Sequence, residues 1–113
     1  MNMNMNTRID GDLLVIELIG EITFFNVGQV ISEIDRSRSV YQVQRVAINA
    51  EAVTMIDSAA FGALVGKARE LNEEEGYMRI SNAHQGIVNA LHRIHMQEVL
   101  PTYKSLEEAI RPW

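Results

Sequence analysis

The stretch that most constrains the fold is a nearly unbroken apolar run early in the chain, residues 13–19 (L-L-V-I-E-L-I). Apolar residues without strict alternation are typical of a central strand that is covered on both faces. Asp10-Gly11 directly precedes the run and predicts a hairpin turn, because Gly tolerates positive φ. We therefore expect a short first strand over residues 7–9, paired with a buried second strand.

Two helical patterns follow this pair of strands. Asn26 is a good N-cap, and a stripe of Val27, Val30, Ile31 and Ile34 predicts a first helix over residues 26–37. Residues 44–49 alternate as a third strand, and residues 51–56 are expected to be a short connection. Strand followed by helix in this order indicates βαβ crossovers and therefore parallel pairing.

The second helix is predicted to begin at Asp57 and Ser58. Both side chains can accept hydrogen bonds from the free N–H groups of a first turn. An apolar stripe of Phe61, Leu64, Val65, Ala68 and Leu71 continues the helix to about residue 75, with Gly76 as its C′ residue. Asp57 and Ser58 thus lie at a helix N-terminus, where backbone donors and the positive dipole end favour added negative charge such as phosphate.

The rest of the chain repeats the alternation of strand and helix. We predict a strand over residues 77–81, a helix capped by Ser81 or Asn82, and a short strand at residues 99–100 that ends at Pro101. Ser105 and Glu108 form a capping box for a closing helix. The predicted order is β-β-α-β-α-β-α-β-α, an α/β class with a mixed, mainly parallel sheet. The expected core contains Leu14, Ile16, Val46, Ile48, Leu64, Val65, Leu91 and Ile94.

Length and composition limit what such a chain can be. The 113 residues are 47% apolar, enough for a single domain over residues 7–113. Residues 1–6, a Met-Asn alternation, are expected to be a disordered tail, with a strand as the alternative. The chain has no cysteine, no apolar stretch that could span a membrane and no signal-peptide pattern, so we expect a soluble, cytoplasmic protein. A net charge of -5 with scattered basic residues argues against a general nucleic-acid binder.

Few residues indicate chemistry of the chain's own. His92 and His95 could share one helix face near His84, but a metal site would need a further ligand at defined spacing, so no metal is expected. The nucleophile-elbow, P-loop and dinucleotide motifs are missing from the sequence, which makes an enzyme or a cofactor site the less favoured hypothesis. Met55, Met78 and Met96 are interpreted as core residues.

The hexapeptide D-S-A-A-F-G (residues 57–62) resembles the D-S-[ST]-G-[LI]-G signature of the STAS family of sulfate transporter and anti-sigma factor antagonist domains. The order of elements from Thr7 to Ile110 is similar to that family too, and the likeness is strongest to its single-domain anti-sigma factor antagonists. Ala59 and Ala60 replace a hydroxyl residue and a glycine of the signature. G-E-I-T (residues 20–23) is similar to the family's Gly-Glu-[IL]-Asp turn, with Thr23 at the aspartate position.

The resemblance implies a fold with helices mostly on one face of the sheet. It also implies a function in which the protein binds an anti-sigma factor with serine-kinase activity. Phosphorylation of Ser58 by that kinase would end the binding, and a phosphatase would restore it. The implied binding surface comprises Thr23, Asp57, Ser58, Ala59, Ala60, Phe61 and Gly62.

Two other interpretations stay open at this point. Phe24-Phe25-Asn26 is similar to the STAS modules of anion transporters, so the chain could serve a sulfate-transporter-type permease and bind a partner protein or a small anion. From the local sequence alone, Asp57 and Ser58 could also be a capping pair without a regulatory role.

Overall fold

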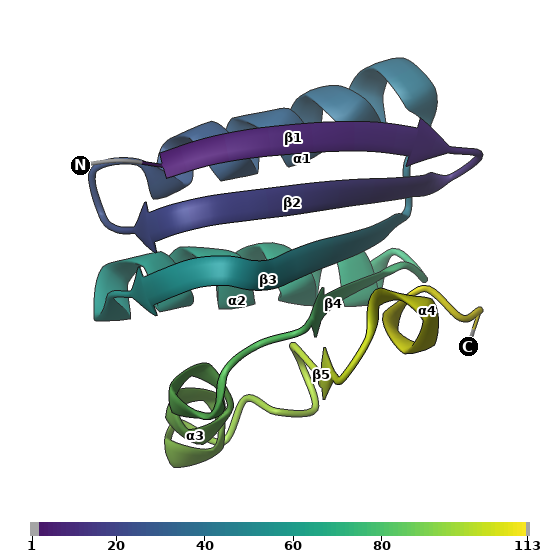
Figure 1. The fold of residues 1–113 in the computed structure, drawn as a ribbon. Helices are drawn as coiled ribbons and strands as arrows, with labels where there is room; N and C mark the ends of the chain where they lie inside the picture. Colours follow the sequence, from purple (N-terminus) through teal and green to yellow (C-terminus); the bar gives the residue numbers. More distant parts are fainter. Residues whose placement is uncertain (1–2, 113) are drawn as a thin grey trace.

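One five-stranded sheet organises the molecule, in the spatial order β1-β2-β3-β4-β5 (Figure 1). The fold comes from a computed structural model that describes residues 3–112. β1 pairs with β2 antiparallel, and the other neighbours pair in parallel, which confirms the mixed, mainly parallel sheet. The strands are β1 (Met3–Asp10), β2 (Leu13–Ile22), β3 (Arg45–Ile56), β4 (Tyr77–Ser81) and β5 (Thr102–Tyr103).

The helices lie mostly on one face of this sheet, as predicted. Figure 1 shows α1 and α2 behind the sheet and α4 on its other side. The apolar side chains of α4, Leu106 and Ile110, pack on that other side against a small cluster that includes Leu13 and Val15 of β2. Within residues 3–112, no helix is long and apolar enough to cross a bilayer. The helices are α1 (Val27–Tyr41), α2 (Ser58–Glu73), α3 (Gln85–Arg93) and α4 (Leu106–Ala109).

β2 is covered on both faces, as its apolar run predicts. Leu14 and Ile16 point into the main core beneath α1 and α2, whereas Leu13 and Val15 point toward α4. The predicted core is confirmed except for Ile94, whose exposed fraction is 46%. α3 ends at Arg93, so Ile94 is the C-cap residue and no longer follows the helical stripe. The predicted core residues that are buried are Leu14, Ile16, Val46, Ile48, Leu64, Val65 and Leu91.

The predicted disordered tail is wrong for residues 3–6, which belong to β1; residues 1 and 2 lie outside the described part of the chain. β1 pairs with β2 without interruption, from Met3 opposite Gly20 to Asp10 opposite Leu13. Met3 and Met5 pack against the main core. The Met-Asn alternation is therefore the period-2 pattern of a strand with one face on the core.

Further boundaries differ from the sequence prediction: β2 continues to Ile22 instead of residue 19, and α1 continues to Tyr41 instead of residue 37. The expected connection over residues 51–56 is the second half of β3, where Ala52 to Ile56 pair with the end of β2. α2 ends at Glu73, and Glu75, with φ of 65°, takes the left-handed conformation expected for Gly76. Position 76 requires glycine for a different reason: a Cβ there would lie 2.0 Å from the backbone oxygen of Gln44.

In the C-terminal part, the cap of α3 and the position of β5 differ from the prediction, and Ser105 caps α4 as predicted. α3 is capped by His84, whose Nδ1 accepts a hydrogen bond from the Gly86 N–H at 3.1 Å, and not by Ser81 or Asn82. The last strand, β5, follows Pro101 instead of ending there, because residues 99–100 turn back onto Met96. Half of the predicted capping box is confirmed: Ser105 Oγ accepts from the Glu108 N–H at 3.2 Å. The Glu108 carboxylate accepts from the Ser105 hydroxyl at 3.3 Å instead of from the Ser105 backbone N–H.

Candidate functional site

The turn from β3 into α2 is built around the Asp57 carboxylate. Asp57 is the N-cap residue of α2, and its Oδ1 accepts a hydrogen bond from the Ala60 N–H at 2.8 Å. Its Oδ2 accepts from the Phe24 N–H at 3.0 Å, across 33 positions of sequence. The Asp57 N–H donates to the Ile22 carbonyl at 3.0 Å. One residue therefore fixes the start of α2 and the loop that follows β2.

That loop, residues 23–26, is held by its own side chains. Asn26 Oδ1 accepts from the Thr23 N–H at 2.8 Å, and Asn26 Nδ2 donates to the Glu21 carbonyl at 2.9 Å. Thr23 Oγ1 accepts from the Phe25 N–H at 3.2 Å. Asn26 precedes α1, but its side chain does not cap the helix as predicted, because these bonds turn it back toward the end of β2. The loop is thus fixed before any partner binds.

Ser58 is the first helical residue of α2, and its side chain is exposed. Within residues 3–112 its hydroxyl has no hydrogen-bond partner, so the expectation that Ser58 shares the capping is wrong. Asp57 has extended backbone angles (φ -80°, ψ 170°), which direct its side chain at the first-turn N–H groups, whereas Ser58 already has helical geometry. The structure therefore leaves an accessible hydroxyl at the start of a 16-residue helix.

The other predicted site residues divide by burial. Ala59 and Gly62 are exposed beside Ser58 on the first turns of α2. Ala60, Phe61 and Thr23 are buried, with exposed fractions of 0%, 8% and 5%. These three can shape the turn from inside, but their side chains do not form its outer surface.

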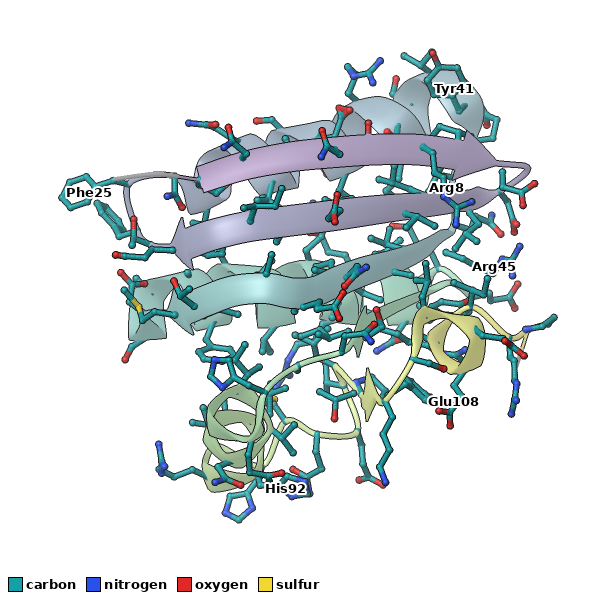
Figure 2. The ribbon with its side chains drawn as sticks, in the orientation of Figure 1. Arg8, Phe25, Tyr41, Arg45, His92 and Glu108 are labelled. Atoms are coloured by element: carbon teal, nitrogen blue, oxygen red, sulfur yellow. The ribbon has the colours of Figure 1, made fainter. Side chains whose placement is uncertain are left out.

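An aromatic knob formed by Phe24 and Phe25 adjoins this turn and is not among the sequence-predicted site residues. The two side chains are 67% and 81% exposed, and their rings pack edge to face with centroids 5.4 Å apart. Figure 2 shows Phe25 projecting from one end of the molecule. Met55, near the end of β3, is 39% exposed, so its interpretation as a core residue is wrong; Met78 is buried as predicted. The sequence signal for the aromatic knob was the position of two adjacent phenylalanines between a strand and an N-cap residue.

Lys67 holds α2 against α1. Its Nζ lies 2.6 Å from Asp35 Oδ1 on α1 and 2.8 Å from Glu70 Oε2 on α2. Burial lowers the pKa of Lys67, but the bonds to Asp35 and Glu70 outweigh this, so the pKa is raised. The ion pairs keep the ammonium charged and fix the helix that carries Ser58.

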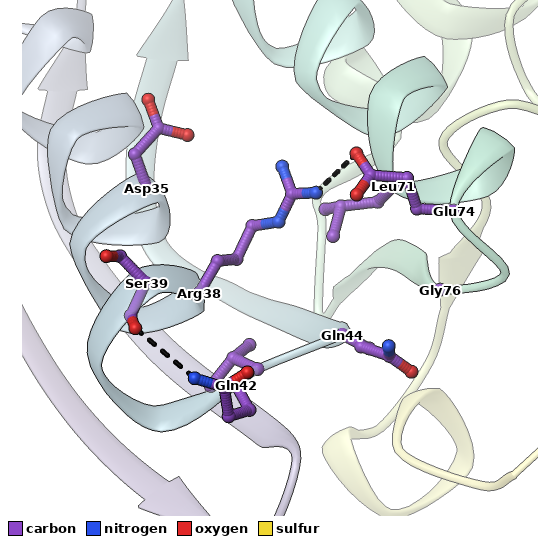
Figure 3. Close-up of a pocket in the computed structure, with 9 residues that line it drawn as sticks. Asp35, Arg38, Ser39, Gln42, Gln44, Leu71, Glu74 and Gly76 are labelled. Carbon is purple, nitrogen blue, oxygen red and sulfur yellow. Dashed lines mark hydrogen bonds and ion pairs between the residues drawn. The ribbon is translucent and has the colours of Figure 1, made fainter.

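A polar pocket of about 370 Å³ lies at the other end of α2 (Figure 3). It opens between the C-terminal ends of α1 and α2, and the Arg38–Glu74 ion pair, at 2.6 Å, crosses it. A helix of 16 residues is about 24 Å long, so this pocket is remote from Ser58. No group of three His, Cys, Asp or Glu residues in the described chain is arranged to hold a metal ion.

Comparison with known proteins gives one family and a set of similar folds. The family model described as "STAS domain" matches residues 4–109. SpoIIAA of Bacillus in its phosphorylated form has a TM-score of 0.75 at 22% identity, with 95% of this chain and 96% of that chain covered. For the unphosphorylated form of the anti-sigma factor antagonist SpoIIAA, the TM-score is 0.72, again at 22% identity, with 95% and 92% covered.

Two other solved structures share the fold at lower identity. An anti-sigma factor antagonist from Mycobacterium paratuberculosis has a TM-score of 0.78 at 17% identity, with 96% and 92% of the two chains covered. A sulfate transporter family protein from Wolinella succinogenes has a TM-score of 0.74 at 15% identity, with 91% and 85% covered. Comparison with curated protein sequences gives no match.

Proposed function

The chain belongs to the STAS domain family, and on this basis we propose that it is an anti-sigma factor antagonist-like regulator, switched off by phosphorylation of Ser58. The unphosphorylated form binds an anti-sigma factor that is also a serine kinase, in the cytoplasm, and a phosphatase restores the binding form. The observation that carries this proposal is the exposed Ser58 hydroxyl on the turn whose Asp57 also bonds the loop of the aromatic knob. The protein itself is a substrate and a binding partner, not an enzyme.

Ser58 suits the role of a phosphate acceptor. Its hydroxyl is accessible to another protein's active site, and the attacking hydroxyl needs no base from this chain because the kinase supplies one. Asp57 fixes the turn on which the hydroxyl stands. SpoIIAA, which shares the fold, has been solved in both phosphorylated and unphosphorylated forms.

A phosphate on Ser58 should change binding more than folding. It adds about -1.5 to -2 charges at neutral pH. The N-terminal end of α2 favours that charge by about 0.3–1 kcal/mol, and the neighbouring Asp57 carboxylate offsets part of this. In a complex, a surface fitted to a small hydroxyl would have to desolvate the phosphate, and an unpaired buried charge costs several kcal/mol. Even a partly hydrated interface should lose roughly a hundredfold in affinity.

The aromatic knob supplies the apolar part of the same surface. Exposed aromatic side chains that enter a pocket of the partner often carry a large share of binding energy. The hydrogen bond from the Phe24 N–H to Asp57 fixes the knob relative to Ser58. A kinase that docks on Phe24 and Phe25 would therefore meet Ser58 in a fixed position.

The test combines capture from a lysate of the source organism with phosphosite mapping by mass spectrometry. Wild-type and Ser58→Ala proteins serve as bait, and Ser32→Ala, which changes another exposed serine, is the matched control. We expect all three to capture a serine kinase and Ser58 to be the phosphorylated residue in wild type and control. Capture of a membrane permease, with Ser58 unmodified, would instead support the transport-module function.

A further inference from the structure

The outer edge of β1 is an open pairing site. β1 is eight residues long and ends the sheet, and within residues 3–112 its only partner is β2 (Figure 1). In an antiparallel edge strand, every second residue directs its N–H and C=O away from the sheet. These groups can pair with another strand. From this edge we infer that two copies of the chain associate through β1, antiparallel to each other, to form a continuous ten-stranded sheet.

Arg8 and Asp10 are the charged residues of β1, and the rest of its edge lacks the features that usually prevent such pairing. Edge strands are commonly protected by Lys, Pro, bulges or short length. Residues 3–7 carry no charge and no proline, and the β1–β2 register has no shift. The opposite edge is protected, because β5 has two residues and follows Pro101. The sheet can therefore extend at one edge only, which gives a closed dimer and not a fibre.

The β1 sequence is complementary to itself in this geometry. A two-fold axis perpendicular to the sheet pairs residues that point to the same face, and registers centred on Asn6 or on Thr7 overlap most of the strand. In both registers a methionine of one copy lies opposite Ile9 of the other, and an asparagine lies opposite Arg8. Neither register places like charges directly opposite each other, an arrangement that would destabilise the pair.

Exposed apolar side chains lie beside this edge as well. Ile9 at the end of β1 is 37% exposed, and Val40 and Tyr41 at the end of α1 are 57% and 48% exposed. Figure 2 shows Tyr41 on the outer side of β1, away from β2. In the two-fold arrangement the α1 helices of both copies flank the seam, so these side chains would lose contact with water. Ser58, at the start of α2 two strands away, would stay open in each copy.

The test measures the mass of the intact chain by sedimentation equilibrium over about 1–300 µM, because dimer formation follows mass action. Wild type should approach twice the chain mass of 12.8 kDa. The variant Asn6→Lys places Lys opposite Lys in the register centred on Asn6 and opposite Arg8 in the register centred on Thr7, and should raise the dissociation constant about tenfold or more. The control Asn89→Lys makes the same charge change at an exposed position of α3 and should remain dimeric.

Hydrogen exchange on the wild-type chain provides a second readout that needs no mutation. The outward-facing amides of β1 should exchange more slowly at the high end of the concentration range than at the low end. A wild-type chain that stays monomeric throughout would overturn the inference. So would an edge variant as dimeric as wild type, a control that dissociates like the edge variant, or β1 exchange that is independent of concentration.

Discussion

Replacing Asp57 with Ala should remove two supports of the site at once. The variant loses the cap on the Ala60 N–H and the bond to the Phe24 N–H. An N-cap substitution of this kind costs about 0.5–2 kcal/mol. The second bond contributes about 0.5–1 kcal/mol, because water can replace the carboxylate at the exposed loop. The total of about 1–3 kcal/mol corresponds to a fall in melting temperature of roughly 4–12 °C for a chain of this size.

Asp57→Asn separates the two supports. Asn has one acceptor oxygen, so either Ala60 or Phe24 loses its bond, and the fall in melting temperature should be about half as large. Thermal melts followed by circular dichroism measure the stability, and amide exchange at Phe24 reports on the loop. Ser58→Ala is the control and should change stability by less than about 0.5 kcal/mol. An Asp57→Ala variant that melts like wild type, or a Ser58→Ala variant that is destabilised as much, would contradict this role of Asp57.

Three further predictions concern the core and the helix that carries Ser58. Leu64→Ala, at a fully buried position, should lower the free energy of unfolding by about 2–5 kcal/mol in urea titrations, and a loss below 1 kcal/mol would contradict the packing. Gly76→Ala should lower the free energy of unfolding by about 1–3 kcal/mol, because its Cβ would meet the Gln44 carbonyl. Gly66→Ala, which has open space around its Cβ in α2, should instead raise the free energy of unfolding. The raised pKa of Lys67 means that its ion pairs stabilise the fold below the unfolded value of 10.5 and that this contribution is lost as the pH rises through the folded value. Lys67→Met should therefore show a smaller loss of stability above pH 10.5 than wild type; an unchanged alkaline profile would refute this.

The fold was predictable because the apolar patterns are long and regular. The run of β2 and the stripes of α1 and α2 each require one extended buried surface, and a single sheet can provide it. Errors arose where tertiary contacts decide the local structure. Residues 3–6 and 51–56 have weak strand signals of their own. Both nevertheless form strands, because they continue the pairing with β2 that more strongly predicted neighbouring residues begin.

The start of α2 at Asp57 and Ser58 was predictable, but the surroundings of this candidate site were not. A capping residue is visible in sequence, whereas the bond from the Phe24 N–H to Asp57 joins segments that are 33 positions apart. Composition also gives no indication that Phe24 and Phe25 are exposed, because two adjacent aromatic residues ordinarily indicate burial. His84 as the cap of α3 was missed because Ser81 and Asn82 are stronger capping residues by type.

The most direct test of the regulatory account is calorimetric titration of the kinase captured with Ser58→Ala bait. It uses wild-type, Ser58-phosphorylated and Ser58→Ala proteins, with circular dichroism to show that all three are folded. We predict that wild type and Ser58→Ala bind with dissociation constants within a few-fold of each other, and that the phosphorylated protein binds roughly a hundredfold more weakly. Equal affinities for all three forms would contradict a switch at Ser58.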